Sequence, residues 1–387
     1  MAVQRIVYLD NAATTKLSQA ARSAMLPYLT DLYGNPTAIY SIGREAKRAI
    51  ENARGIVADA IGALPEEVFF TSGGTESINW AIKSAVEMRS GVGKHIITSA
   101  IEHSAVLNTL KYLEKHGCEV TYLGVDRRGQ ISLDDLRSAI RDDTILISIM
   151  AANNEIGTIL PTAEIGKIAR ERGVLFHTDA VQAVGKIPVD VGEMGVDLLS
   201  FSGHKIGGAK GVGVLYVKRG LKLPPFLHGG GQERGKRSGT ENVAGIVSLA
   251  AAFDDIPPSL PSRKVTQMRD RLIDALLKIP RTHLTGDPVN RLPGIASFVF
   301  ECVEGESMLL MLDQCGICAS SGSACSSGSL DPSHVLMAVG LPHEIAHGSL
   351  RLSLGEDNTD EDIDYVIEKL QEIIAKLRAM SPLWNEV

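Results

Sequence analysis

Short apolar runs alternate with helical patterns through the first two thirds of the chain. The apolar runs lie at residues 68–71, 94–99, 120–123, 144–150, 174–177 and 198–202. Around and between them, apolar residues recur at the spacing of an α-helix, as in residues 44–61, 78–88 and 133–140. Apolar strands separated by helices are typical of a mainly parallel β-sheet with helices on both faces. We therefore expect an α/β fold here.

The pattern changes after residue 256, where Pro257, Pro258 and Pro261 predict a linker. Beyond it, the spacing of apolar residues predicts helices at 265–277, 307–312 and 362–377, and strands at 295–300, 317–320 and 347–354. These elements form a second, smaller α+β unit. We expect a large domain of residues 15–255 and a small domain of residues 1–14 and 256–387, which carries a mobile cysteine loop.

Polar side chains follow the ends of five predicted strands. They are Gly74 with Thr75, His103, Asn154, Asp179 with Gln182, and Lys205. Each has an ordinary explanation as a helix cap, a turn former or a surface lysine. Because the carboxyl ends of parallel strands lie at one edge of a sheet, these groups can also converge on one site. Their shared position favours that interpretation.

Two glycine-rich segments are candidates for binding phosphate. Residues 72–77 join a strand to a helix, and free N–H groups at a helix start bind anions, although Ser72 or Thr75 could equally cap the helix. Residues 228–242 nearly match a nucleotide-binding P-loop, but Arg237 replaces the required Ser or Thr and no strand leads into it. We interpret this segment as a cationic loop in which Thr240 donates a hydrogen bond to phosphate.

Three further residues carry candidate chemistry. Lys205 ends a buried strand, where desolvation can lower the pKa of a lysine and make its amine nucleophilic. Cys325 lies in a run of small residues, so its thiol is expected to be accessible and reactive rather than an incidental loop cysteine. Arg351 lies in an apolar strand, as an edge charge or as a clamp for a substrate carboxylate. Cys315 and Cys318 form a lone C-x-x-C pair, which favours packing over zinc binding.

Composition excludes several classes of protein. The 387 residues carry a net charge of −7 without a dense Lys/Arg run, which argues against nucleic-acid binding. No apolar stretch approaches the roughly 18 residues of a membrane span, and residues 1–15 lack the pattern of a signal peptide. Five cysteines are an odd and sparse count, which indicates reduced thiols and a cytoplasmic location.

The chain resembles the cysteine desulfurases of the NifS/IscS type. The resemblance covers essentially the whole chain and is most specific in YLDNAATT at 8–15, HTDAVQAVGK at 177–186, SGHK at 202–205, RSGTEN at 237–242 and SGSAC at 321–325. The last motif is that of the family's first class. The resemblance implies the pyridoxal-phosphate (PLP) transferase fold of type I, with a mainly parallel seven-stranded sheet in the large domain.

The resemblance also implies a role for each candidate residue. Lys205 would hold PLP as a Schiff base, Asp179 would pair with the ring nitrogen, His103 would stack on the ring and assist proton transfer, and Gln182 would bond the ring oxygen. The implied phosphate ligands are Gly74, Thr75, Ser202, His204 and, from the partner subunit of a homodimer, Thr240. The implied ligands of the substrate carboxylate are Asn11, Asn154 and Arg351, and Asn154 would also contact the cofactor.

The activity implied by the resemblance is the conversion of L-cysteine to L-alanine. Sulfur would pass to Cys325 as a persulfide, for delivery to an iron–sulfur scaffold or a sulfur-carrier protein. No firm metal site is expected, and Cys325 is a candidate for a transient iron–sulfur ligand. Two alternatives stay open. A PLP-dependent lyase or aminotransferase would not need Cys325, and a non-catalytic sulfur-relay protein would use Cys325 without a cofactor.

Overall fold

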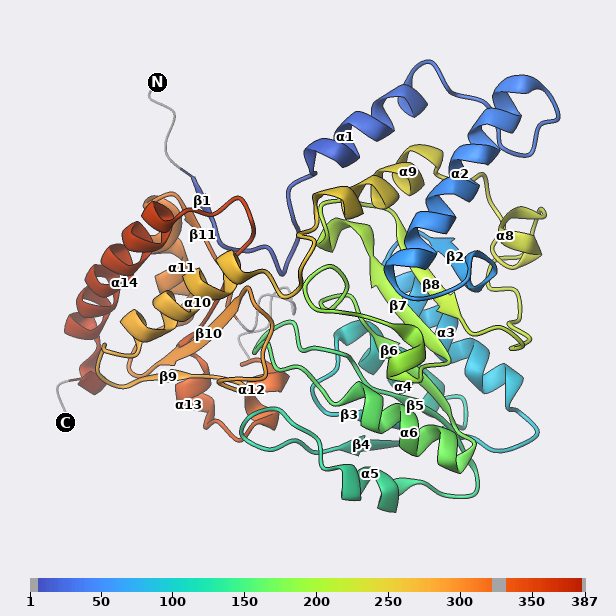
Figure 1. The fold of residues 1–387 in the computed structure, drawn as a ribbon. Helices are drawn as coiled ribbons and strands as arrows, with labels where there is room; N and C mark the ends of the chain where they lie inside the picture. Colours follow the sequence, from blue (N-terminus) through green and yellow to red (C-terminus); the bar gives the residue numbers. More distant parts are fainter. Residues whose placement is uncertain (1–5, 322–331, 385–387) are drawn as a thin grey trace.

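The computed structural model describes residues 6–321 and 332–384, and its centre is a seven-stranded sheet (Figure 1). The strands lie in the order β2-β8-β7-β6-β5-β3-β4. Their bounds are β2 (Val68–Thr71), β3 (His95–Ser99), β4 (Glu119–Leu123), β5 (Thr144–Ser148), β6 (Leu175–Asp179), β7 (Leu198–Ser202) and β8 (Gly213–Val217). Only β8 runs antiparallel to its neighbours within this sheet. The expected α/β fold with a mainly parallel sheet is confirmed.

Helices cover both faces of this sheet. The bounds are α1 (Gln19–Met25), α2 (Ser41–Ala60), α3 (Gly74–Met88), α4 (Ser104–Glu114), α5 (Leu133–Ala139), α6 (Thr162–Arg172), α7 (Val191–Met194), α8 (Gln232–Gly235) and α9 (Val243–Ala251). Adjacent strand residues point to opposite faces. Phe70 packs in one cluster with Ile50 of α2, whereas Phe69 packs in another with Trp80 of α3. Both faces are therefore buried, which explains the near-continuous apolar strands.

Helix α3 begins four residues before the predicted start at residue 78. The prediction placed residues 72–77 in a loop because the first turn of the helix is polar. In the structure Ser77 lies inside the helix, and its Oγ donates to the Gly73 carbonyl (3.1 Å) and lies 2.7 Å from Thr71 Oγ1. The helix therefore starts directly after the loop that follows β2, which places its N-terminus at the edge of the sheet.

A second, antiparallel sheet lies beside the first, in the order β12-β10-β9 (Figure 1). Its strands are β9 (Thr282–Leu284), β10 (Ile295–Phe300) and β12 (Ser349–Ser353). The associated helices are α10 (Arg263–Leu276), α11 (Gly305–Gln314), α12 (His334–Ala338), α13 (His343–Ala346) and α14 (Asp360–Met380). The N-terminal strand β1 (Val7–Tyr8) pairs in parallel with β11 (Ile317–Cys318), so both ends of the chain contribute to this region.

Short 3₁₀ turns complete the chain. They are η1 (Leu26–Leu29), η2 (Pro65–Glu67), η3 (Gly203–Lys205), η4 (Ala252–Asp255) and η5 (Pro382–Trp384). Among residues 6–321 and 332–384, no helix combines the length and the apolar character that a membrane span requires.

Candidate active site

The carboxyl ends of β6 and β7 bring together three of the expected residues, Asp179, Gln182 and Lys205. Asp179 is the last residue of β6, is buried, and accepts a hydrogen bond from the Val181 backbone N–H (2.9 Å). Burial raises the pKa of Asp179, and this rise is opposed by electrostatic interactions with His103 and Lys205 and by the N–H bond. Both side chains therefore lie within electrostatic range of a buried carboxyl group.

Lys205 reaches this place on the 3₁₀ turn that directly follows β7. Its Nζ donates to the backbone carbonyls of Ala12 (2.6 Å) and Ala13 (2.7 Å). Gln182, expected at the same site, donates to the Ala12 carbonyl as well (2.9 Å). The N-terminal segment thus forms part of the site, and it was noticed in the sequence only through the resemblance of residues 8–15.

The start of α3 provides a place for an anion. Gly73 is the N-cap residue, and no side chain caps the helix, so its first N–H groups have no partner within the helix. A Cβ atom at Gly74 would lie 2.8 Å from Val181 Cγ2, and one at Gly73 would lie 3.9 Å from Ser202 Oγ. Ser202 therefore lies beside this helix start, and Gly74 leaves no room for a side chain.

His204 and His103 are each oriented by a hydrogen bond. Nδ1 of His204 lies 3.1 Å from Thr14 Oγ1. Burial, with the charges of Lys205 and Lys210, lowers the pKa of His204 to about 4, so the ring is neutral near pH 7. Nδ1 of His103 accepts from the Ala105 N–H (3.1 Å), which caps α4 and leaves the proton on Nε2. The alternative that His103 is a helix cap is therefore confirmed, and it is compatible with a role in the site.

Thr75 and His103 line the same cavity. It has a volume of about 390 Å³, lies between α3 and α4, and is also lined by Asn79 and Tyr112. The two residues follow different strands, β2 and β3, and are 28 positions apart by their numbers. Their meeting supports the expectation that strand ends converge.

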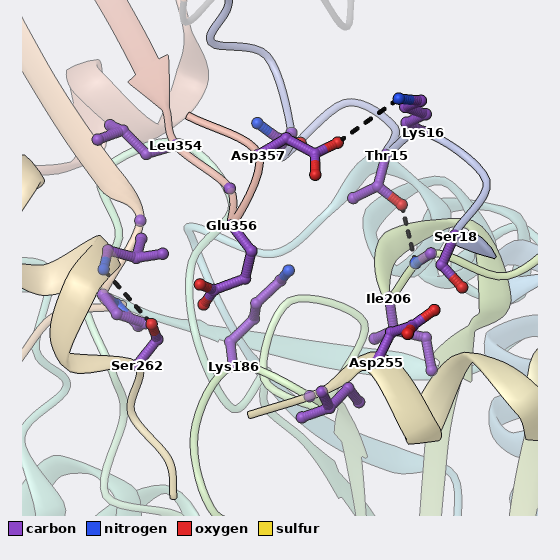
Figure 2. Close-up of a pocket in the computed structure, with 18 of the residues that line it drawn as sticks. Thr15, Lys16, Ser18, Lys186, Ile206, Asp255, Ser262, Leu354, Glu356 and Asp357 are labelled. Carbon is purple, nitrogen blue, oxygen red and sulfur yellow. Dashed lines mark hydrogen bonds and ion pairs between the residues drawn. The ribbon is translucent and has the colours of Figure 1, made fainter. Parts of the chain in front are cut away.

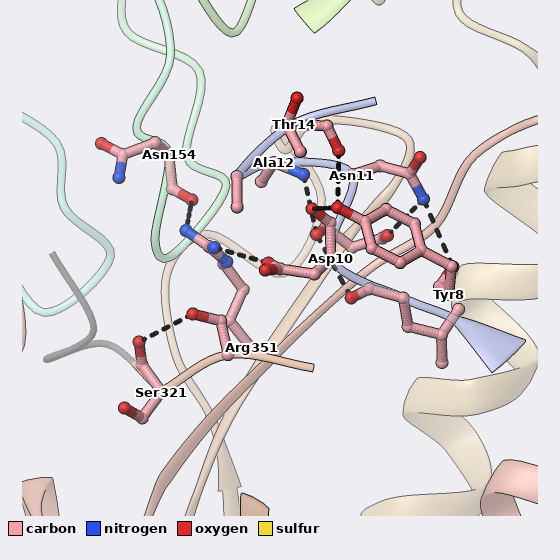
Figure 3. Close-up of polar contacts among 12 residues, drawn as sticks. Tyr8, Asp10, Asn11, Ala12, Thr14, Asn154, Ser321 and Arg351 are labelled. Atoms are coloured by element: carbon pink, nitrogen blue, oxygen red, sulfur yellow. Dashed lines mark hydrogen bonds and ion pairs between the residues drawn. The ribbon is translucent and has the colours of Figure 1, made fainter. Parts of the chain in front are cut away.

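Arg351 is buried in β12 and faces the N-terminal segment (Figure 3). Its Nη2 donates to Asp10 Oδ1 (2.9 Å) and its Nη1 donates to the Asn154 carbonyl (2.9 Å). Its Nε is buried and has no hydrogen bond to the residues that the structure describes. Asn11 lies next to Asp10 and donates to the Ser353 carbonyl (2.9 Å). A buried guanidinium with an unsatisfied N–H is suited to an anionic ligand such as a carboxylate.

Three buried or half-buried carboxyl groups near these residues were missed in the sequence: Asp10, Glu102 and Glu155. Burial raises the pKa of Glu102 to about 8, although Ser99 Oγ (2.6 Å) and the Met150 N–H (3.0 Å) donate to it. Asp10 and Glu102 directly precede the candidates Asn11 and His103. That adjacency was the available signal, but a carboxylate beside a turn is usually solvent-exposed.

Two expected residues are not joined to this group. Thr240 is exposed, and within the described residues no hydrogen bond links it to the others. Its loop is fixed by Arg237, whose Nε donates to Glu76 Oε1 in the first turn of α3 (2.8 Å). Cys325 lies outside the described residues. Among the residues that the structure describes, no group of His, Cys, Asp or Glu is arranged to hold a metal ion.

Comparison with known proteins assigns the family. The model of the aminotransferase class-V family matches residues 7–366. A protein from Methanosarcina thermophila named cysteine desulfurase IscS is 58% identical over 381 residues, which cover 98% of this chain and 94% of that protein. The chain belongs to the cysteine desulfurase family. A Clostridium botulinum protein of the same name is 52% identical over 385 residues, covering 98% of this chain and 97% of the relative.

Solved structures of this desulfurase's relatives agree in fold. A NifS-like protein superposes with a TM-score of 0.91 at 40% identity, covering 96% of this chain and 100% of that one. A structure titled SspA in complex with cysteine superposes with a TM-score of 0.81 at 39% identity, covering 90% and 98%. The predicted resemblance to NifS/IscS-type desulfurases is confirmed, and membership implies a PLP-dependent enzyme.

Proposed function

We propose that this chain uses PLP to convert L-cysteine to L-alanine and transfers the sulfur to Cys325 as a persulfide. The observation that carries the proposal is the convergence of Lys205, Asp179 and His103 beside the uncapped start of α3. The structure titled as a complex with cysteine, at 39% identity, supports cysteine as the substrate.

The residues at the strand ends have the chemistry that PLP requires. An amine (Lys205) suits its aldehyde, and a buried carboxylate (Asp179) suits its protonated ring nitrogen. Helix N–H groups at Gly74 and Thr75, together with Ser202 and His204, suit its phosphate. His103 would stack on the ring, and Gln182 would bond its oxygen. When bound, PLP supplies an electron sink that stabilises negative charge at the substrate Cα.

The side chains of this chain would then bind the substrate and move its protons. Arg351, with Asn11 and Asn154, would hold the carboxylate, for which the unbonded Nε of Arg351 is available. Nζ of Lys205 would take the Cα proton and return a proton to the carbon that loses sulfur. Its contacts with Ala12 and Ala13 orient the amine before substrate binds. Nε2–H of His103 is a second proton donor.

Sulfur transfer would take place between Cys325 and the bound substrate. The Cys325 thiolate attacks the substrate sulfur, an S–S bond forms as the Cβ–S bond breaks, and the electron pair passes to the carbon that is protonated and released in alanine. The chain is fixed close to Arg351 before this cysteine, because Arg351 N–H donates to Ser320 O (2.7 Å) and Ser320 N–H donates back (3.2 Å). The four residue-to-residue steps from Ser321 to Cys325 can span up to about 14 Å.

We propose the surrounding organisation on the same basis. It comprises a large domain of residues 15–255, a small domain of residues 1–14 and 256–387, and a homodimer in which Thr240 completes the partner's phosphate site. The sulfur acceptor would be an iron–sulfur scaffold or a sulfur-carrier protein. Separate packing clusters for the two sheets support the division. The cytoplasmic location stays a prediction from the cysteine count.

Two substitutions test the reaction. Lys205→Ala should lower alanine formation at least about a thousandfold, because it removes the amine that is proposed to move the Cα proton. Cys325→Ala should keep the visible absorbance of bound PLP and lose persulfide transfer. Alanine formation and protein-bound persulfide are measured by mass spectrometry with L-cysteine as substrate. Sulfur transfer that survives Cys325→Ala would favour a lyase or aminotransferase, and a colourless wild-type protein would favour a relay protein.

A further inference from the structure

A larger cavity, of about 540 Å³, opens beside the candidate active site (Figure 2). It lies between the turn that follows β6, the N-terminal segment around Thr15 and the loop between β12 and α14. It shares Asn11, Ala12 and Gln182 with the candidate active site, but Lys205, Asp179, His103 and Arg351 are not among its lining residues. Its volume is within the range of about 300–1,000 Å³ that small-molecule sites occupy. It is therefore large enough for a ligand of its own.

One side of this cavity carries the amine of Lys186. The turn that presents it is fixed, because Lys186 N–H donates to Ala183 O (2.9 Å) and Gly185 has a φ of +72°. A Cβ atom at Gly185 would lie 2.8 Å from side-chain atoms of both Ile206 and Ile256, so the turn requires glycine. Lys186 ends the segment 177–186 that carries Asp179 and Gln182, but the proposed reaction gives it no role.

The amine of Lys186 lacks a partner in the described part of the chain. No hydrogen bond or ion pair to it occurs among residues 6–321 and 332–384. Burial lowers the pKa of Lys186, and the charge of Glu356 opposes this shift. A partly buried ammonium group without an acceptor is costly, and an anionic ligand would relieve that cost.

Glu356 provides the opposite charge: it lines the same cavity, its charge acts on the pKa of Lys186, and Figure 2 draws the two side chains in the same part of the cavity. Within the described chain the carboxylate and the amine form no ion pair within 4.0 Å. Two other acidic residues of the wall are already engaged. Asp357 pairs with Lys16 (3.9 Å), and Asp255 accepts from the Ala20 N–H (3.1 Å). Ile206 and Leu292 add an apolar surface to the same wall.

We propose that this cavity binds a free α-amino acid with an apolar side chain, at a position that adjoins the candidate active site but does not include Lys205. Its carboxylate would contact Lys186, its ammonium group would contact Glu356, and its side chain would lie over Ile206 and Leu292. A plain carboxylate would leave Glu356 unpaired, and a plain amine would leave Lys186 unpaired. An amine and a carboxylate in the wall of one partly apolar cavity, not paired with each other, therefore favour a zwitterion.

Binding of L-leucine to the full-length, cofactor-loaded protein tests this site. Equilibrium dialysis with radiolabelled L-leucine should show binding at least about tenfold tighter than that of 4-methylpentanoate, which lacks the ammonium group, or of 3-methylbutylamine, which lacks the carboxylate. Lys186→Met should abolish the preference for leucine over 3-methylbutylamine. Glu356→Gln, which changes an exposed side chain, should abolish the preference for leucine over 4-methylpentanoate.

Two further variants keep the result unambiguous. Lys186→Arg retains the positive charge and should retain leucine binding if Lys186→Met fails for electrostatic reasons. Arg351→Leu removes the proposed substrate clamp and should leave this leucine site intact. Wild-type leucine affinity in both Lys186→Met and Glu356→Gln, or loss of leucine binding in Arg351→Leu alone, would overturn the proposal. Because binding and not turnover is measured, the result is independent of the proposed reaction.

Discussion

Two buried arginines, Arg54 and Arg351, are similar in exposure, at 5% and 3%, but differ in their partners. Arg54 lies in α2 and forms a bidentate pair with Glu233, with N–O distances of 2.9 and 2.8 Å. It also donates to Val68 O (2.9 Å), and its Nε donates to Glu51 (3.3 Å). All three nitrogens are therefore satisfied within the chain, which is the pattern of a structural ion pair.

Arg351 has a different balance. Within residues 6–321 and 332–384, its guanidinium contacts one carboxylate, that of Asp10, and one carbonyl, and its Nε has no partner. Arg291 also leaves a buried nitrogen unbonded, so an unsatisfied atom alone does not identify a ligand site. At Arg351 the unbonded nitrogen belongs to a side chain that contacts Asn154 and Asp10, the neighbour of Asn11. Both arginines are therefore buried to a similar extent, and burial alone does not separate them. Arg351, which is proposed to bind substrate, differs in its incomplete hydrogen bonding beside other candidate residues.

The largest expected effect is on catalysis by Arg351→Leu. We expect kcat/KM for L-cysteine to fall about a thousandfold, because the proposed carboxylate contact is lost and Asp10 keeps an unpaired charge in its place. Initial rates of alanine formation, expressed per folded and PLP-loaded molecule, measure this effect. Arg351→Lys keeps the charge but not the planar geometry and should recover only part of the loss.

Arg54→Leu should instead act on stability. We expect the free energy of unfolding to fall by about 3 kcal/mol, because Glu233 is left buried and charged. Urea unfolding followed by circular dichroism measures the change. The folded fraction should keep kcat/KM within about threefold of the wild type, since Arg54 contacts none of the proposed site residues. A large catalytic loss with unchanged stability would contradict the structural assignment and remove the contrast with Arg351.

The sequence predicted the apolar framework better than these ion pairs. Strand β10 matches its predicted range, 295–300, because six mostly apolar residues are bounded by turns. The segment 228–242 was interpreted as a cationic loop facing phosphate. The structure buries Glu233 of this segment against Arg54, which is 179 positions away, and the sequence did not predict that pair. The Asp10–Arg351 pair spans 341 positions. Ion pairs between residues so far apart in the sequence depend on how the sheets pack, and the local spacing of residues does not predict them.

The smallest expected effect is the pH dependence of stability at Glu155, a buried carboxyl group close to Arg351. Burial raises the pKa of Glu155 to about 7, against the Ser333 hydrogen bond and the charge of Arg351. A carboxyl group whose pKa is raised by folding stabilises the folded protein at low pH, and this contribution is lost as pH rises from about 4.5 to about 7. Between pH 5 and pH 8, wild-type protein should therefore lose about 2.5 kcal/mol more stability than Glu155→Gln.

Urea unfolding at several pH values measures this difference, and the Arg54 region offers a matched control. Glu51 pairs with Arg54 from an exposed position, with 55% of its side chain accessible. Water screens such a charge, so Glu51→Gln should follow the wild-type pH dependence. Parallel curves for wild type and Glu155→Gln would mean that Glu155 ionises as easily in the folded protein as in the unfolded one. In that case Glu155 near Arg351 and Glu51 near Arg54 would not differ in how folding affects their ionisation. The difference between the two regions would then rest on the unbonded Nε of Arg351 alone.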